Sequence, residues 1–145
     1  EWPGATSGTM DIVCNRDGIP CFMAELGQGG MLLREDVAAS RQGMLNLMIS
    51  MGMLEGTLKG PKERRVITRR GFIRSDYAGM LDMRAAPCGI MKKDEAFAYI
   101  HYFGEERSPC LLKEDAFFIG VRRLPAVNTG DPLCLVGYDW HMRAV

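Results

Sequence analysis

The spacing of hydrophobic and polar positions changes near residue 57. In the preceding part, apolar residues recur every three or four positions and predict a helix over 36–53. In the part that follows, short alternating runs are separated by glycine, proline and aspartate, which predicts strands joined by turns. The sequence therefore predicts an α/β segment, residues 1–56, then an all-β segment, residues 57–145, and an α+β chain overall.

Two further elements are expected in the α/β segment. A capping candidate, Ser7, and a glycine, Gly18, flank a short apolar run that predicts a helix beginning near Met10. The apolar run 21–24 predicts a buried strand, because a short continuous apolar run is typical of a strand covered on both faces. The polar, glycine-rich segment 25–30 is then expected to form the turn at the carboxyl end of this strand.

The all-β segment contains an internal repeat. Residues 93–100 and 129–136 align at an offset of 36 positions, with turn residues, acidic residues and alternating apolar residues in register. Upstream, 90–91 aligns in the same way with 126–127. Two copies predict a pseudo-two-fold β structure with a shared core, since a solenoid needs at least three repeats. The strands expected are 65–68, 79–84, 97–103, 116–121 and 133–138.

Composition narrows the functional classes. The 145 residues carry 18 basic and 18 acidic side chains, and this balance argues against a nucleic-acid-binding or membrane-surface protein. No apolar run approaches the length of about 20 residues that a membrane-spanning helix needs. The chain begins at Glu1, without an initiator methionine or the shape of a signal peptide, so we expect it to be a fragment of a longer protein.

The cysteines indicate a reducing compartment. The sequence has five, and none forms a Cys-x-x-Cys pair, so no zinc knuckle or thioredoxin-type site is expected. Cys21 and Cys134 lie in apolar runs, which predicts small buried hydrophobic side chains in a cytoplasmic protein. The 11 methionines fit the same interpretation, because most fall in apolar segments where methionine fills gaps.

Four stretches of the α/β segment carry a family resemblance: Gly18-Ile19-Pro20, Met23-Ala24-Glu25-Leu26-Gly27, Gly43-Met44-Leu45-Asn46-Leu47 and Gly52-Met53-Leu54. Together they resemble the succinylglutamate desuccinylase/aspartoacylase family of enzymes. The α/β segment is similar to the end of the family's zinc-carboxypeptidase-like catalytic domain. The pattern over 127–136 resembles half of a biotinyl/lipoyl-like barrel-sandwich domain, and the family's usual C-terminal domain is of this kind. The resemblance implies the C-terminal portion of a zinc hydrolase that deacylates N-acyl amino acids or similar small amides, with bacterial N-acetyl-diaminobutyrate deacetylases as neighbours.

Glu25 is the candidate catalytic residue. A carboxylate at the carboxyl end of a buried α/β strand lies where such sheets bind ligands, although a glutamate there can also simply brace the loop. The resemblance implies the catalytic role, because the glutamate of the family's Glu-x-Gly motif is the general base and acid. In that chemistry zinc polarises the amide carbonyl and lowers the pKa of its bound water. The carboxylate takes the proton of this water and returns it to the leaving amine.

The family's zinc ligands have no counterpart in this sequence. They are a His-x-x-Glu pair and a later histidine, all upstream of the catalytic glutamate, and no histidine precedes Glu25. His101 and His141 lie in the all-β segment without a ligand partner at useful spacing, so both are expected to be structural or surface residues. Arg16 is given no substrate-binding role, and the substrate-binding residues are unknown. We expect zinc in the intact parent, no metal on this chain and no activity from this chain alone.

The sequence also suggests two functions other than a deacylase. A non-catalytic binding or assembly module built on the all-β segment is compatible with the neutral charge. A lipoyl or biotin carrier is rejected, because the hairpin position expected for its lysine is Gly104, and Lys92 falls in an earlier turn. The expected partner is a small N-acyl substrate in the parent, with no nucleic acid and no membrane. A homo-oligomer, docking on the all-β segment or local disorder would relieve the uncovered apolar run 21–24.

Overall fold

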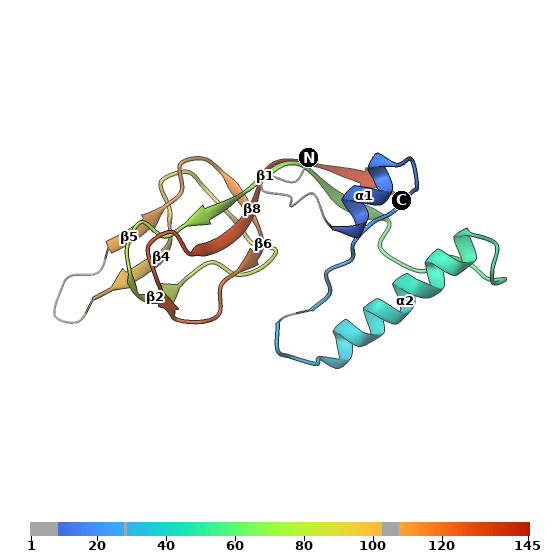
Figure 1. Ribbon diagram of the computed structural model, residues 1–145, viewed down its shortest axis with the longest axis horizontal. Coiled ribbons are helices and arrows are strands. Elements are labelled where there is room, and N and C mark those ends of the chain that lie inside the picture. Colours follow the sequence, from blue (N-terminus) through green and yellow to red (C-terminus); the bar gives the residue numbers. More distant parts are fainter. Residues whose placement is uncertain (1–8, 28, 103–107) are drawn as a thin grey trace. The chain divides into compact units, whose positions relative to one another are not determined.

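The computed structural model describes residues 9–27, 29–102 and 108–145. The chain divides into two compact units, one formed by residues 1–62 with Val145 and the other by Glu63–Ala144 (Figure 1). Among the described residues, the first unit contains two helices and the second contains eight strands. Helices and strands are therefore segregated along the chain, as the hydrophobic pattern predicts.

Helix α1 spans Met10–Arg16 and ends at a glycine, as expected. Gly18 has a φ of +77°, and the Ile19 amide donates a hydrogen bond to the Cys14 carbonyl over 2.8 Å. A left-handed glycine with this hydrogen bond is a common way to end a helix. The predicted capping residue Ser7 lies outside the described residues.

Helix α2 spans Arg34–Ser50, so it begins two residues earlier and ends three residues earlier than the predicted helix over 36–53. Its end is again marked by a glycine. Gly52 has a φ of +70°, and the Met53 amide donates to the Met48 carbonyl over 2.9 Å. The left-handed glycine turns the chain away before the last apolar residue of the pattern is reached.

The prediction of a strand over 21–24 is wrong. The segment from Cys21 to Leu26 forms neither helix nor strand, and Phe22 and Met23 are 68% and 58% exposed. A strand needs a neighbour for its backbone N–H and C=O groups. The described part of the first unit contains no other strand that could supply one. The run is apolar enough for a buried strand, but it has no partner here.

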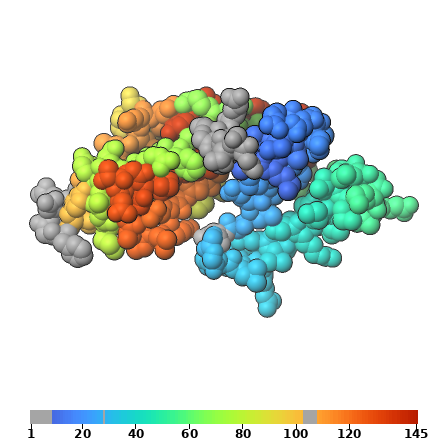
Figure 2. Space-filling view, in the orientation of Figure 1, coloured from blue at the N-terminus to red at the C-terminus, as the bar shows by residue number. Residues whose placement is uncertain are grey.

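Neither helix has a buried residue. Met44, in α2, and Met51, directly after its last residue, are 59% and 66% exposed, and the side chains of α2 lie at the surface in Figure 2. The first unit therefore presents apolar side chains that its own residues do not cover. The expectation that dimerisation, docking on the all-β segment or local disorder relieves this exposure stays a prediction. No helix in the described ranges combines the length and apolar character needed to cross a bilayer.

The second unit consists of two four-stranded antiparallel sheets, with strand orders β1-β8-β6-β3 and β5-β4-β2-β7. All five strands that the sequence predicts are present, and β6 has the predicted bounds. Strands β3, β5 and β7 were not predicted as strands, because runs of two to four residues are too short to show a period. The strands are β1 Glu63–Arg74, β2 Gly79–Met83, β3 Ile90–Met91, β4 Ala96–His101, β5 Ser108–Leu111, β6 Ala116–Val121, β7 Ala126–Val127 and β8 Pro132–Ala144.

The two copies of the repeat exchange strands. Strand β3 of the first copy lies in the sheet that contains β8 of the second copy, where it pairs with β6. Strand β7 of the second copy lies in the sheet that contains β4 of the first copy, where it pairs with β2. Strands β3 and β7, which align in the sequence, thus occupy equivalent edges of the two sheets. This exchange confirms the predicted pseudo-two-fold arrangement.

The turns that precede β4 and β8 are also equivalent. The Lys92 amide donates to Glu95 Oε2 over 3.0 Å, and the Asn128 amide donates to Asp131 Oδ2 over 3.0 Å. Each acidic side chain therefore accepts a hydrogen bond from the backbone three residues earlier. The alignment of acid with acid in the sequence reflects one kind of turn that is built twice.

The core of the second unit draws matching residues from both copies. Phe97 and Ile100 of β4 are 1% and 0% exposed, as are Leu133 and Val136 of β8, which lie 36 positions later. The ring of Phe118, on β6, lies 5.9 Å from that of Phe97. Burying each such side chain contributes roughly 1.5–3 kcal/mol, so this shared core stabilises the unit.

The sequence predicts buried cysteines, but only one of the five is buried in the structure. Cys134 is buried in the core, and this burial raises the pKa of its thiol to about 12. Cys88 is exposed and has a φ of 65°, so the prediction is wrong there. The difference follows from local sequence, because Cys134 lies within an apolar strand whereas Cys88 lies in a turn between strands.

Candidate functional site

Glu25 lies in the irregular segment that joins α1 to α2. Its side chain is exposed, and no hydrogen bond or ion pair connects its carboxylate with another described residue. The described contacts therefore do not show Glu25 bracing the loop. An exposed carboxylate can come within hydrogen-bond reach of a water molecule or a substrate, which a general base requires.

Gly27, two residues after Glu25, packs against the first turn of α2. Its φ is +75°, and a Cβ atom built on it would lie 2.7 Å from Asp36 Oδ2. That oxygen is buried and has no hydrogen-bond partner among the described residues. The turn therefore requires glycine both for its left-handed backbone and for the space beside Asp36. The sequence indicates a close approach at this glycine but does not identify Asp36 as the neighbour.

The other end of the segment is attached to α1. Asn15, in the last turn of the helix, donates a hydrogen bond from Nδ2 to the Cys21 carbonyl over 2.8 Å. The neighbouring Arg16 forms an ion pair with Asp17 at 2.9 Å and lies in the same helix. The Asn15 side chain thus links the helix to the start of the segment, and sequence reasoning missed it because asparagine at this position has no distinctive pattern.

The described residues do not fit the zinc ion that the family resemblance implies. No group of three histidine, cysteine, aspartate or glutamate side chains among them is placed to hold a metal ion. His101 of β4 has Nε2 3.7 Å from Asp82 Oδ2, whereas His141 of β8 is exposed. Protein zinc sites use three or four ligands at bonding distance, and these side chains do not supply them.

Lys92, the lysine considered for a carrier function, lies in the turn between β3 and β4. Its Nζ atom pairs with Asp115 Oδ2 at 2.7 Å. The hydrogen bond to Asp115 raises the pKa of Lys92, which keeps the ammonium charged. The hairpin positions near Gly104 lie outside the described residues.

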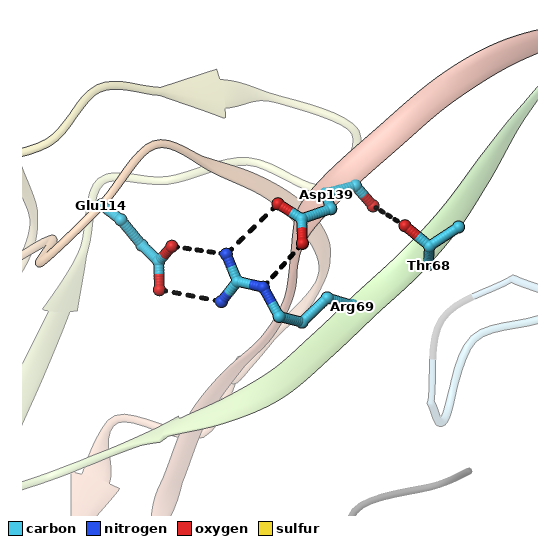
Figure 3. Close-up of polar contacts among 4 residues, drawn as sticks. All are labelled: Thr68, Arg69, Glu114 and Asp139. Atoms are coloured by element: carbon cyan, nitrogen blue, oxygen red, sulfur yellow. Dashed lines mark hydrogen bonds and ion pairs between the residues drawn. The ribbon is translucent and has the colours of Figure 1, made fainter.

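A polar cluster in the second unit is centred on Arg69 (Figure 3). Its guanidinium donates hydrogen bonds to Glu114 over 2.6 and 3.0 Å and to Asp139 over 2.7 and 3.3 Å. Hydrogen bonding to Arg69 is the main reason that the pKa values of both carboxyl groups are lowered. The guanidinium also lies 4.7 Å from the centre of the Tyr138 ring.

This Arg69 cluster joins β1, β8 and the turn before β6. Its charged groups are about half exposed, so water and salt screen their attraction. With both carboxylates bound by the arginine, the cluster connects strands of the sheet. Sequence reasoning missed it because its members are 45 and 70 positions apart and share no motif.

A cleft of about 390 Å³ opens in the second unit. Most of its lining comes from 72–77 and 109–114, two segments that begin in the edge strands β1 and β5. Phe97 and Tyr138 also line it. Its volume is within the range of small-molecule sites. None of the residues that the sequence predicts for function lines this cleft.

Comparisons with known proteins find similarity to the family that the sequence motifs indicate. No protein-family model matches the chain. The N-alpha-acetyl-L-2,4-diaminobutyric acid deacetylase of Halomonas elongata is 25% identical over 134 residues, which cover 88% of this chain and 39% of the deacetylase. This chain therefore spans about two fifths of the length of that curated relative.

Solved structures share the fold. The succinylglutamate desuccinylase/aspartoacylase of Rhodobacter sphaeroides matches with a TM-score of 0.77 and 19% identity, over 92% of this chain and 43% of that one. The product-bound ectoine utilization protein EutE (DoeB) of Ruegeria pomeroyi matches with a TM-score of 0.81 and 20% identity, over 91% of this chain and 42% of that one. The curated relative and these structures confirm that the chain resembles the succinylglutamate desuccinylase/aspartoacylase family over part of those proteins' length.

Proposed function

We propose that this chain is the C-terminal part of a deacylase that hydrolyses N-acyl amino acids or similar small amides, with Glu25 as general base and acid. The observation that carries the proposal is the exposed Glu25 carboxylate on a glycine turn, without a described partner. The name of the Halomonas relative, a deacetylase of an N-acetylated diamino acid, supports the substrate class. A cytoplasmic location is part of the same proposal.

The proposed role of Glu25 is proton transfer. Its carboxylate takes a proton from the water that attacks the amide carbonyl and returns it to the leaving nitrogen as the C–N bond breaks. The segment around Glu25 is held at both ends, by Asn15 on the Cys21 carbonyl and by the fit of Gly27 against Asp36. These two contacts limit the path of the backbone that carries Glu25.

In this proposal the zinc ligands of the intact enzyme lie outside the described residues, since these form no metal-binding group. The expected result is that the 145-residue chain alone neither retains stoichiometric zinc nor hydrolyses an N-acetylated diamino acid. Metal analysis of the purified chain and a product-release assay check this. One zinc per chain, or turnover above that of buffer, would contradict it.

In the same proposal the second unit is a barrel-sandwich domain of the biotinyl/lipoyl type that does not act as a carrier. The exchange of β3 and β7 between the two copies of the repeat supports this assignment. The ion pair of Lys92 with Asp115 supports a structural role for the lysine in its turn.

Substitution of Glu25 in the intact enzyme tests the proposal. Glu25→Gln keeps the shape of the side chain and removes the charge that accepts the proton, so kcat is expected to fall about 10²–10⁴-fold. Zinc content is expected to stay unchanged. Glu35→Gln, at another exposed glutamate of the first unit, is the matched control and is expected to keep its activity. A Glu25→Gln enzyme with the kcat of the parent contradicts the proposed role.

A further inference from the structure

The cleft of the second unit opens where two edge strands of different sheets meet. In the described ranges, β1 pairs with β8 alone and β5 pairs with β4 alone. Residues 72–74 of β1 and 109–111 of β5 line the same cleft, so it lies between the sheets at these edges. Phe97 and Leu112, each 1% exposed, also line it. The space of about 390 Å³ therefore reaches the core of the unit.

Exposed apolar side chains gather at this cleft. Phe72, Tyr77 and Leu111 are 42%, 51% and 53% exposed, and all three line it. They come from β1, from the connection between β1 and β2, and from β5. Exposed apolar side chains that converge on a concave site are typical of a ligand-binding groove. The cleft thus offers a partly aromatic, apolar surface to a bound molecule.

Two of the four charged side chains at the cleft already have partners in the unit. Arg74 donates from Nη1 to a backbone carbonyl over 2.8 Å, and Glu114 belongs to the Arg69 cluster. The other two, Asp76 and Lys113, form no hydrogen bond or ion pair with a described residue. Both are exposed, so one carries a negative charge and the other a positive charge at neutral pH. The cleft therefore offers one charge of each sign to a ligand.

An extended peptide fits these edges poorly. Pro109 in β5 has no N–H group to donate to an added strand. Prolines and charges on edge strands oppose the addition of another strand, and pairing β1 with β1 of a second copy would bring arginines together. The occupant expected is therefore a small molecule. The arginines of β1 are Arg64, Arg65, Arg69, Arg70 and Arg74.

We propose that this cleft binds a free amino acid with an apolar side chain, such as phenylalanine. Such a zwitterion carries one charge of each sign beside an apolar group, which are the three features that the cleft can match. The ammonium group of the ligand pairs with Asp76, and its carboxylate pairs with Lys113. Its side chain packs against Phe72, Tyr77 and Leu111. Binding here is separate from the proposed deacylation, so the test needs no measurement of activity.

Titration of the ¹⁵N-labelled full chain with L-phenylalanine, followed by the NMR shifts of its amides, tests the proposal. Saturable shifts are expected, mainly at residues 72–77 and 109–114. The Kd is expected to be on the order of 1–10 mM, because the ligand is small and water screens the two charges. Shifts that grow linearly to the solubility limit of the amino acid, or that fall mainly outside these segments, overturn the proposal.

Three analogues separate the contacts of the ligand. N-acetyl-L-phenylalanine lacks the ammonium group and L-phenylalaninamide lacks the carboxylate. Each is expected to bind about two- to fivefold more weakly than phenylalanine, since each loses one exposed ion pair. Glycine keeps both charges and lacks the side chain, so it is expected to bind at least about fivefold more weakly. Binding of glycine as tight as that of phenylalanine contradicts the apolar contact.

Two variants assign the charges. Lys113→Gln and Asp76→Asn are each expected to raise the Kd of phenylalanine about two- to fivefold. Lys113→Gln should leave the Kd of phenylalaninamide unchanged, and Asp76→Asn should leave that of N-acetylphenylalanine unchanged. Lys93→Gln, at an exposed lysine that does not line the cleft, is the matched control and should bind phenylalanine as the parent does. A parental Kd in both cleft variants, or equal weakening of both analogues by one variant, overturns the assignment.

Discussion

The two units of the chain differ in what holds them together. Among the residues that the structure describes, the second unit buries 12 hydrophobic side chains, whereas neither helix of the first unit has a buried residue. The described contacts of the first unit include local hydrogen bonds, such as those between Asn46 and Lys59 at 2.6 and 3.0 Å. One hydrogen bond contributes about 0.5–1.5 kcal/mol net, less than the roughly 1.5–3 kcal/mol of one buried large side chain.

The candidate catalytic group therefore lies in the unit with the weaker internal packing. Glu25 is held by Asn15 at one end of its segment and by the fit of Gly27 against Asp36 at the other. Regions that open or move at low cost are often those that bind ligands and perform catalysis. We infer that the geometry around Glu25 in the intact enzyme depends on whatever covers the apolar side chains of the first unit.

The largest effect on stability is expected from truncating Phe118 in the core of the second unit. Phe118→Ala should lower the free energy of unfolding of this unit by about 3–5 kcal/mol, because Phe118 is fully buried and leaves a cavity. Phe72→Ala, at a ring that is 42% exposed, should cost about 1 kcal/mol or less. Urea denaturation of the full chain, followed by circular dichroism of the β-sheet, measures both. Similar losses in the two variants would show that the core does not stabilise this unit.

A smaller and local effect is expected in the first unit. Gly27→Ala places a Cβ atom against Asp36 at a backbone angle that alanine disfavours, and should destabilise the turn by about 1–2 kcal/mol. Gly29→Ala is the control, because a Cβ atom there meets nothing within 4 Å. Amide hydrogen exchange over residues 21–33 should become faster only in Gly27→Ala. Equal exchange in the two variants would show that the fit against Asp36 does not hold the turn.

The smallest effect is expected at the Arg69 cluster. The pKa values of Glu114 and Asp139 are lowered in the folded chain, so the cluster stabilises it above the ordinary carboxyl pKa, and this stabilisation is lost as the pH falls through the lowered values. In Arg69→Met, the urea midpoint should therefore fall less between neutral and acidic pH than in the parent. Arg123→Met, at another exposed arginine, should behave as the parent does. An identical acid sensitivity in Arg69→Met contradicts this account.

The second unit was the more predictable one, because its pattern occurs twice. The bounds of β6 follow from its own short apolar run, and the equivalence of β3 and β7 follows from the repeat. That they exchange between the sheets could not be predicted, since strand pairing depends on contacts distant in sequence. The contacts of Arg69 with carboxylates 45 and 70 positions away could not be predicted for the same reason.

The first unit shows the limit of local sequence patterns. The run 21–24 has the composition of a buried strand, but a strand forms only where a partner is present. The place of Glu25 on a glycine turn could be predicted from its neighbours. The approach of Asp36 to Gly27 could not, because it depends on side-chain packing across the turn.

Hydrogen exchange of the full chain, resolved by peptide, tests the contrast between the two units most directly. The account predicts that amides of β4, β6 and β8 exchange at least about 10³-fold more slowly than unstructured amides, because they open only with the core of the second unit. Amides of α2 should exchange within about tenfold of the unstructured rate, since this helix buries no side chain. Protection of α2 equal to that of β6 would contradict the account.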